Sequence, residues 1–322
     1  MSYKILVVGG AGYIGSHVQK QLLEDGFDVV VLDNLSSGDK VNILEKTTFI
    51  EGDILDTNSL DKAMSLGING VVHLAAKKAV GESMINPTIY ASNNITGSIN
   101  ILNSMVKHNV KYIVFSSSAA VYGMPEYIPI DENHKINPIN YYGYTKRAIE
   151  ENMEWFKRLG KLNYIALRYF NAVGYAKDKT ITGRERNPQN LMPIIMEAAT
   201  NKRDGFSIFG NDYETKDGTC VRDYIHVMDL AKAHSLALKK LFVENKSYTL
   251  NLGTGIGTSV KEIVDATEKV IGKKLNYNYA PRREGDPAIL TAKADLAYKI
   301  LGWEPEYTDV EDIISTVWNL EI

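Results

Sequence analysis

The sequence predicts an α/β protein with a doubly wound parallel sheet and a smaller C-terminal α/β lobe. Two observations carry this prediction. From the N-terminus to about residue 174, short apolar runs alternate with segments of helical periodicity, a pattern typical of strand-helix-strand units. Beyond that point the pattern changes to short strands, glycine-containing loops and shorter helices. We therefore expect a sheet domain over residues 1–174 and a second lobe over residues 175–322, with some segments of the lobe returning to the sheet domain.

The first element is a buried strand that leads into a glycine-rich turn. Residues 5–8 form an unbroken apolar run, as expected of a parallel strand covered on both faces. Gly9, Gly12 and Gly15 follow at three-residue spacing, and apolar residues then recur at helical spacing as far as Leu22. Such glycines let the backbone turn tightly, approach a diphosphate and pack the helix against its strand. The turn predicts a Rossmann-type dinucleotide site, with the pyrophosphate at the helix N-terminus.

The second strand supports this interpretation. The segment 28–34 contains another apolar run, residues 29–32, which ends in Asp33 at the distance that a strand-helix-strand unit requires. A carboxylate there can accept hydrogen bonds from the adenosine ribose, and its charge would repel a 2′-phosphate. We therefore expect NAD rather than NADP as the cofactor.

The remaining elements follow in order. We expect strands at 48–50, 71–75, 111–115 and 164–167, and helices at 56–66, 87–108 and 141–159, the last of them stopped by Gly160. In the second lobe we expect a helix within 187–199, a strand at 249–252, a helix at 260–270 and a terminal amphipathic helix at 310–318.

Composition excludes several classes of function. The net charge is −3 with no long run of one sign, which argues against nucleic-acid or anionic-membrane partners. Met1 leads straight into the first strand and no apolar stretch has membrane-spanning length, so we expect a cytoplasmic protein. The six histidines have no metal-ligand spacing, so we expect no metal site, and the single cysteine, Cys220, is expected to be a small buried hydrophobe.

Three polar residues are expected to meet at the carboxyl edge of the sheet, where open α/β sheets bind ligands. Ser118 closely follows the fifth strand, and Tyr142 and Lys146 lie four residues apart near the start of the next helix, so they share one face. A lysine ammonium and an oxidised nicotinamide would favour the phenolate and lower the tyrosine pKa from about 10 toward working pH. Tyr142 would then remove a proton from a substrate alcohol as hydride leaves its carbon for NAD, while Ser118 holds the same oxygen.

The same spacing occurs a second time, at Tyr175 and Lys179. This pair follows the sixth strand in a segment without a helical pattern, where a spacing of four gives no shared face. We interpret it as a coincidence in a chain with 19 tyrosines.

The chain resembles the UDP-glucose 4-epimerases, a family of the extended short-chain dehydrogenase/reductase superfamily. The similarity runs from Tyr3 to Trp318. Its most specific stretches are residues 7–15, 74–83, 115–123, 168–174, 218–227 and 280–286.

The resemblance implies two sets of binding residues. The NAD site would include, besides the three glycines, Asp33 and the catalytic pair, the residues Tyr13, Ile14, Asn34, Asp53, Ile54, Leu74, Ala75, Lys78, Asn93, Ser116 and Phe170. The UDP-hexose would be held, besides Ser118, by Asn171, Asn190, Leu191, Phe209, Arg222, Arg283, Asp286 and Leu290. Both arginines suit this role because a guanidinium fork matches diphosphate oxygens.

The resemblance also implies a reaction and an assembly. Hydride would pass from C4 of the hexose to NAD, giving a 4-keto intermediate tethered by its nucleotide; the sugar would turn over and hydride would return to the opposite face. UDP-glucose and UDP-galactose would interconvert, and the cofactor would stay bound throughout. The helices at 87–108 and 141–159 would pair with their copies in a homodimer.

Other functions remain open at this point. A nucleotide-sugar dehydratase or decarboxylase would share the fold and the Tyr/Lys pair, although related dehydratases usually place an acid pair after the active-site hydroxyl, where this chain has Ala119 and Ala120. A catalytically silent NAD-binding scaffold is a third possibility. Leu290 corresponds to a size gate in the family, where an aromatic restricts the substrate and a small residue admits N-acetylated sugars. Leucine is intermediate, so we expect slower turnover of the N-acetylated pair.

Overall fold

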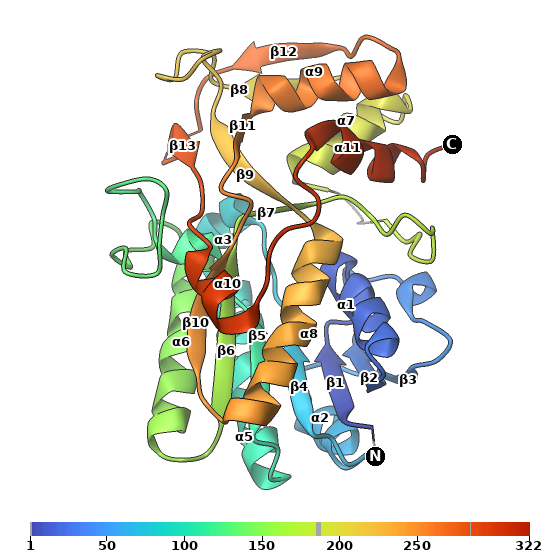
Figure 1. Ribbon diagram of the computed structural model, residues 1–322, viewed down its shortest axis with the longest axis vertical. Helices are drawn as coiled ribbons and strands as arrows, with labels where there is room; N and C mark the ends of the chain where they lie inside the picture. Colours follow the sequence, from blue (N-terminus) through green and yellow to red (C-terminus); the bar gives the residue numbers. More distant parts are fainter. Residues whose placement is uncertain (1, 185–187, 284) are drawn as a thin grey trace.

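The computed structural model describes residues 2–184, 188–283 and 285–322. Within them, seven parallel strands form one sheet (Figure 1), which confirms the predicted fold class. The strands lie side by side in the order β3 (Thr48–Glu51), β2 (Asp28–Asp33), β1 (Lys4–Val8), β4 (Gly70–His73), β5 (Tyr112–Ser116), β6 (Asn163–Tyr169) and β10 (Tyr248–Leu252). The order reverses between β1 and β4, which is where folds of this kind form their ligand crevice.

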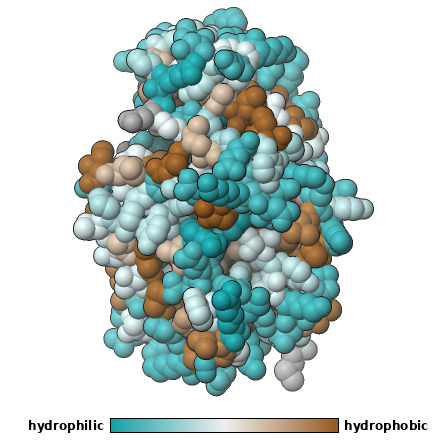
Figure 2. Space-filling view, turned by 90° about the vertical axis from the view of Figure 1, so that its left-hand side faces the viewer, coloured by the Kyte–Doolittle hydropathy of each residue, from teal (hydrophilic) through white to brown (hydrophobic). Residues whose placement is uncertain are grey.

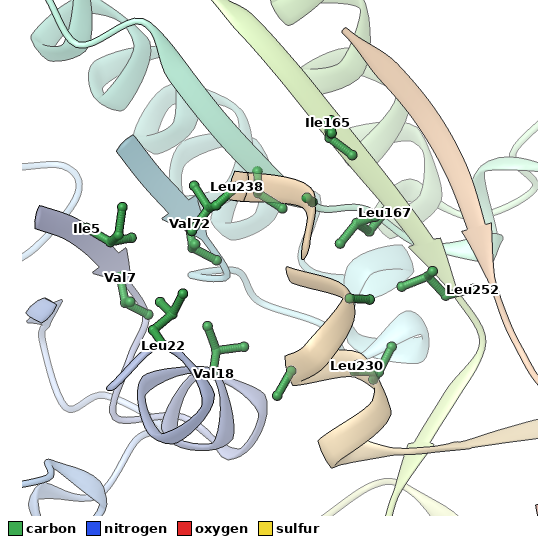
Figure 3. Close-up of a cluster of buried hydrophobic side chains, with 14 of the residues drawn as sticks. Ile5, Val7, Val18, Leu22, Val72, Ile165, Leu167, Leu230, Leu238 and Leu252 are labelled. Atoms are coloured by element: carbon green, nitrogen blue, oxygen red, sulfur yellow. The ribbon is translucent and has the colours of Figure 1, made fainter. Parts of the chain in front are cut away.

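Both faces of the sheet are covered by helices. The helices on one face are α1 (Tyr13–Glu24), α8 (Val227–Glu244) and α10 (Asp295–Leu301), and those on the other are α2 (Thr57–Met64), α5 (Gly97–Lys107) and α6 (Tyr141–Arg158). Alternate residues of β1 therefore enter different cores: Ile5 and Val7 pack with Val18 and Leu22 of α1 (Figure 3), whereas Leu6 packs on the opposite side. This double burial is why the strands read as continuous apolar runs.

The helix expected at 87–108 is present, with a π-helical turn in its middle and a separate short helix before it. The structure has α3 (Val80–Ile85), α4 (Pro87–Tyr90), a π-helical turn η2 (Ala91–Thr96) and then α5. Gly97, the first residue of α5, packs closely against the side chain of Ile54: a Cβ on Gly97 would lie 2.4 Å from Ile54 Cδ1. The wider turn η2 brings an asparagine pair toward the sheet edge, and π-helical turns are frequent at functional sites.

The second lobe lies above the sheet in Figure 1 and has its own apolar core. Its helices are α7 (Leu191–Ala199), α9 (Val260–Ile271) and α11 (Val310–Trp318), and its strands are β7 (Asn171–Val173), β8 (Phe206–Phe209), β9 (Val221–His226), β11 (Gly257–Ser259), β12 (Tyr277–Ala280) and β13 (Ile289–Leu290). The helix expected within 187–199 begins at Leu191; residue 187 lies outside the described residues.

The expectation of only shorter helices after residue 175 is wrong. Helix α8 has 18 residues, as many as α6, and it lies across one face of the sheet beside α1. Buried polar residues such as Asp229, His234 and Ser235 interrupt its apolar pattern, which is why the sequence did not reveal it. The chain then returns to the sheet through β10, which pairs with β6.

Two surface and core features complete the fold. Cys220 is buried, as the sequence predicted. Among the described residues, none of the helices combines the length and the apolar character needed to cross a membrane.

Candidate active site

The glycine-rich turn between β1 and α1 leaves room for a ligand at Gly12. Gly9 has φ +85°, and a Cβ there would lie 2.6 Å from the backbone nitrogen of Ala75; a Cβ at Gly15 would lie 2.2 Å from the carbonyl oxygen of Gly9. Both positions therefore require glycine for packing within the protein. A Cβ at Gly12 would approach only the Gly9 oxygen, at 3.4 Å. The first N–H groups of α1 have no partner within the helix, so the turn fits a dinucleotide pyrophosphate.

Asp33 lies at the end of β2, beside this turn. Its Oδ2 accepts a hydrogen bond from the backbone N–H of Ala11 (2.9 Å), and its Oδ1 accepts one from Leu35 (2.8 Å). Burial raises the pKa of Asp33, and these two hydrogen bonds oppose the shift. Each carboxylate oxygen retains acceptor capacity for a ribose hydroxyl. The neighbouring Asn34 donates to Asp53 Oδ2 at 2.7 Å, which joins the ends of β2 and β3.

The structure brings Ser118, Tyr142 and Lys146 together. Ser118 follows β5, and a hydrogen bond links its side chain to that of Tyr142. Asn140 caps α6 by accepting from the Gly143 N–H at 2.8 Å, so the helix begins just before Tyr142. Lys146 lies one turn further on, with Nζ 5.8 Å from the centre of the Tyr142 ring and 2.7 Å from the Ser116 carbonyl oxygen.

The charge states of this pair differ from the sequence-based expectation. Burial raises the pKa of Tyr142 to about 12, and the hydrogen bond with Ser118 only partly opposes the shift. Burial also lowers the pKa of Lys146 to about 7, although the negative charge of Glu150 acts to raise it. The expected lowering of the tyrosine pKa is therefore wrong for the protein alone, because burial disfavours both charged forms.

Three further residues hold the start of α6, and the sequence analysis missed them. Ser83 Oγ accepts from the Tyr142 N–H at 3.1 Å, and Thr145 Oγ1 donates to the Tyr142 carbonyl at 2.7 Å. Asn94, in η2, donates to Thr145 Oγ1 at 3.1 Å and also accepts from the Lys77 N–H at 2.8 Å. No local pattern marks the contacts of Ser83 and Asn94, because their partners are 17 or more residues away. The Thr145–Tyr142 contact lies within one helical turn, and Asn140 is a residue type that commonly caps helices.

The other expected NAD residues lie around the same edge, with different side-chain surroundings. The Tyr13 hydroxyl donates to the Gly174 carbonyl at 2.5 Å. The N–H groups of Leu74 and Ala75 both donate to the Val8 carbonyl, directly after β4. Ile14 lies in the first turn of α1 and Lys78 lies between β4 and α3, whereas Asn93 lies within η2 and Phe170 directly follows β6.

Two of the expected NAD residues direct their side chains elsewhere. The side chain of Ile54 is buried in the core against Gly97, so it is the Ile54 backbone that lies beside Asp53. The Ser116 hydroxyl lies 2.7 Å from Nε2 of His234 on α8. Its carbonyl, in contrast, is the acceptor of Lys146.

The expected substrate residues gather in the second lobe. Arg222 on β9 forms an ion pair with Asp286, and the guanidinium of Arg283 lies 4.0 Å from the centre of the Phe209 ring. Leu290 on β13 pairs with Arg222 on β9. The residues Asn190 and Leu191 mark the start of α7, and Asn171 lies on β7, which is paired with β9.

The second Tyr/Lys pair is separate from this site. Tyr175 is buried in the core of the second lobe, and Lys179 is an exposed residue with φ 56°. No helix spans the segment between them, all of which the structure describes. The two side chains therefore share no helical face, as the sequence predicted.

Fold and site together define a Rossmann-fold, dinucleotide-dependent enzyme of the serine-tyrosine-lysine type. The NAD dependent epimerase/dehydratase family matches residues 5–253. The chain is 47% identical to a UDP-glucose 4-epimerase of Halalkalibacterium halodurans over 98% of this chain and 94% of that protein. It therefore belongs to the NAD dependent epimerase/dehydratase family and, within it, to the UDP-glucose 4-epimerases.

Solved structures agree with this assignment. The crystal structure of UDP-glucose 4-epimerase from Brucella ovis in complex with NAD is 42% identical, with a TM-score of 0.95 over 98% of this chain and 97% of that one. The enzyme from Bifidobacterium longum in complex with NAD+ and UDP is 37% identical, with a TM-score of 0.93 over 99% and 98% of the two chains.

Proposed function

We propose that this protein interconverts UDP-glucose and UDP-galactose by NAD-dependent epimerisation at C4 of the hexose. The observation that carries the proposal is the cluster of Tyr142, Lys146 and Ser118 at the carboxyl edge of the sheet that also carries the glycine-rich turn. A general acid-base group, a cation and a hydroxyl are the parts that proton removal from a sugar alcohol requires. The substrate class rests on the named relatives together with the arginine-containing cluster of the second lobe.

NAD would bind along the carboxyl edge of the sheet. Its pyrophosphate would rest on the N-terminus of α1 at Gly12, and its adenosine ribose would be held by Asp33. Lys146 would face the nicotinamide ribose. We propose that the other NAD-binding residues expected from the sequence also contact the cofactor. Ile54 and Ser116 would do so through their backbone atoms, because their side chains are directed elsewhere.

The nucleotide part of the substrate would lie in the second lobe. Arg222 and Arg283 come from different segments, and both guanidinium groups can donate to diphosphate oxygens. Phe209 offers an apolar ring, and it is held in place under Arg283. Strong contacts to the nucleotide and looser ones to the sugar would let the hexose turn over without leaving.

The chain's own residues would carry the proton. When bound, NAD supplies a hydride acceptor that returns the hydride in the same cycle. Tyr142 Oη takes the proton from the C4 hydroxyl and later gives it back, Ser118 Oγ holds the same oxygen, and the Lys146 ammonium stabilises the phenolate. The 4-keto sugar formed between these steps stays attached to its nucleotide.

We also propose that residues 1–174 form the NAD lobe and that residues 175–322 form mainly the substrate lobe.

We propose in addition that the protein is a homodimer paired through α5 and α6. The face of the molecule on the left of Figure 1 carries several separate hydrophobic patches among hydrophilic residues (Figure 2). On α6, Tyr144 is 50% exposed and Trp155 is 60% exposed. Sedimentation analysis should find a dimer, and Trp155→Glu should shift it toward monomer; a monomeric wild-type protein would refute the pairing.

The function is tested by incubating the purified protein with UDP-galactose, without added oxidant, and recording proton NMR spectra. We expect UDP-glucose to appear until equilibrium is reached. A 4-keto-6-deoxy product would indicate a dehydratase, and an unchanged spectrum would indicate a scaffold.

A further inference from the structure

A buried ion pair lies directly behind the proposed catalytic residues. Glu150 is one helical turn beyond Lys146 on α6, and Arg168 lies on β6; both are at least 95% buried. Arg168 donates from Nε to Glu150 Oε1 (2.9 Å) and from Nη2 to Oε2 (2.6 Å), a two-pronged contact. The Ser117 hydroxyl donates to Glu150 Oε1 at 2.7 Å. One carboxylate thus contacts the residue next to Ser118 and faces the helical turn of Lys146.

The pair is anchored on its far side as well. Arg168 Nη1 donates to the Tyr122 hydroxyl at 3.0 Å, and that hydroxyl donates to Asn251 Oδ1 at 2.6 Å. Asn251, on β10, donates in turn to the Ile130 carbonyl at 3.0 Å. Arg168 on β6 and Ser117, directly after β5, therefore both hold the Glu150 carboxylate, and Arg168 is itself fixed by Tyr122.

A purely structural reason for this pair is weak. Removing two charges from water costs several kcal/mol per ion, and replacing a buried ion pair by apolar residues of similar volume is often neutral or stabilising. The pair lies one helical turn from Lys146, so it can influence the charge of that lysine. Burial lowers the pKa of Lys146 to about 7, and the charge of Glu150 opposes that shift.

The other titratable groups around Lys146 do not oppose the effect of burial on its pKa. They are Tyr142 on α6 and His73 on β4. Two arginines face Glu150 instead: Arg168, and the partly exposed Arg147, whose Nη1 lies 3.6 Å from Glu150 Oε2. Burial raises the pKa of Tyr142 to about 12, and His73, whose pKa is lowered to about 3 by burial, is neutral. Glu150 is the anion of this set, and Arg168 moderates its field.

We propose that Glu150 and Arg168 are positioning residues for the reaction: together they set the charge of Lys146 and hold the loop that carries Ser118. The inference rests on the proposed function, because the charge of Lys146 matters only if Tyr142 works as the acid-base group. Neither residue touches the substrate. Glu150 favours the ammonium form, and Arg168 limits that effect while it orients the carboxylate.

The test measures the titration of Lys146 directly, by NMR of protein labelled with ¹³C at lysine Cε. The signal is assigned by its loss in Lys146→Met. In Glu150→Gln, which keeps an acceptor for Ser117, the titration should move to lower pH by about one unit, the usual scale for a neighbouring charge. In Arg168→Met it should move to higher pH. The matched control is Glu151→Gln, because Glu151 is an exposed carboxylate next along α6, and it should leave the titration unchanged.

The two charges predict opposite shifts, whereas a purely structural pair predicts none or the same shift in both variants. The alkaline limb of the kcat profile should move in the same direction as the lysine signal in each variant. If a single variant does not fold, Glu150→Gln/Arg168→Met decides: its titration should lie below that of wild type, and an unchanged or raised titration would overturn the proposal. The NMR titration needs no activity, so failure of the proposed function would be seen separately, as absence of product with the lysine shifts intact.

Discussion

At the scale of single residues, the site holds a tyrosine and a lysine that are both pushed toward their neutral forms. The pKa of Tyr142 is raised to about 12 and that of Lys146 is lowered to about 7, in each case mainly by burial. The sequence could predict that these residues share a face, because their spacing is local. It could not predict the direction of the pKa shifts, because burial depends on β5 and on the segments around Ser83 and Asn94.

Replacing Tyr142 by phenylalanine tests its proposed role. Tyr142→Phe should lower kcat by roughly two to four orders of magnitude, the usual scale for loss of a general acid-base group. The melting temperature should change little, because the aromatic ring remains. Tyr175→Phe is the matched control from the second Tyr/Lys pair and should keep its kcat. Near-normal turnover by Tyr142→Phe would show that another group moves the proton.

Leu290 tests the proposed size gate. It is half-buried and packs with Phe170 against the small apolar cluster that contains Tyr122 and Ile130. One packing difference in an apolar pocket is worth about 1–3 kcal/mol, so a graded preference is expected. Wild type should have a higher kcat/KM for UDP-glucose and UDP-galactose than for the N-acetylated pair.

The variants at this position separate a gate from ordinary packing. Leu290→Tyr should selectively suppress kcat/KM for the N-acetylated pair, and Leu290→Ala should selectively raise it. If both variants change kcat/KM for the two substrate pairs by the same factor, Leu290 only packs against its neighbours.

At the scale of elements, predictability follows how local the controlling interactions are. The boundaries of α9 and α11 could be predicted because the apolar spacing and the caps, Ser259 and Asp309, are local to each helix. The strands β7, β11 and β13 have three, three and two residues, and all of them pair with β9 from distant parts of the chain. Because tertiary packing determines their pairing, no local sequence pattern predicts these strands.

The turn before α1 gives a prediction that separates binding from folding. Gly12→Ala should fold with a near-normal melting temperature, because an added Cβ meets only the Gly9 oxygen at 3.4 Å. Its NAD content should fall, because a methyl group would occupy space that the pyrophosphate needs. Each loss of about 1.4 kcal/mol in the free energy of NAD binding lowers the affinity about tenfold.

Gly15→Ala is the contrasting variant. An added Cβ would lie 2.2 Å from the Gly9 carbonyl oxygen, so this variant should lose stability as well as NAD. Thermal unfolding and enzymatic cycling of released cofactor measure the two properties. Normal NAD content in Gly12→Ala would place the pyrophosphate elsewhere.

At the scale of the whole molecule, buried histidines should make the protein sensitive to acid. Burial lowers the pKa of His17 and His234 to about 4 and that of His73 and His226 to about 3. The unfolded chain binds these protons near pH 6.5, so the free energy of unfolding should fall as the pH drops from about 6.5 toward 3. Burial also raises the pKa of four carboxyl groups, which opposes this trend: Asp33, Glu132, Asp223 and Asp229, the last to about 6.

Urea unfolding at pH 7.5 and pH 5.0 measures this difference. The free energy of unfolding should be lower at pH 5.0, and His234→Gln should reduce the difference between the two conditions. Equal stability of the wild type at both pH values would contradict the histidine account.

The central claim is that NAD and the sugar nucleotide are bound together, so that the hydrogen at C4 leaves and returns within a single binding event. The most direct test is to supply UDP-galactose deuterated at C4, in ordinary water, and to examine the UDP-glucose formed by NMR and mass spectrometry. The account predicts that the deuterium is retained at C4 of the product, because it travels as hydride and returns to the same carbon. Product in which the C4 deuterium has been replaced by solvent hydrogen would contradict an internal redox cycle.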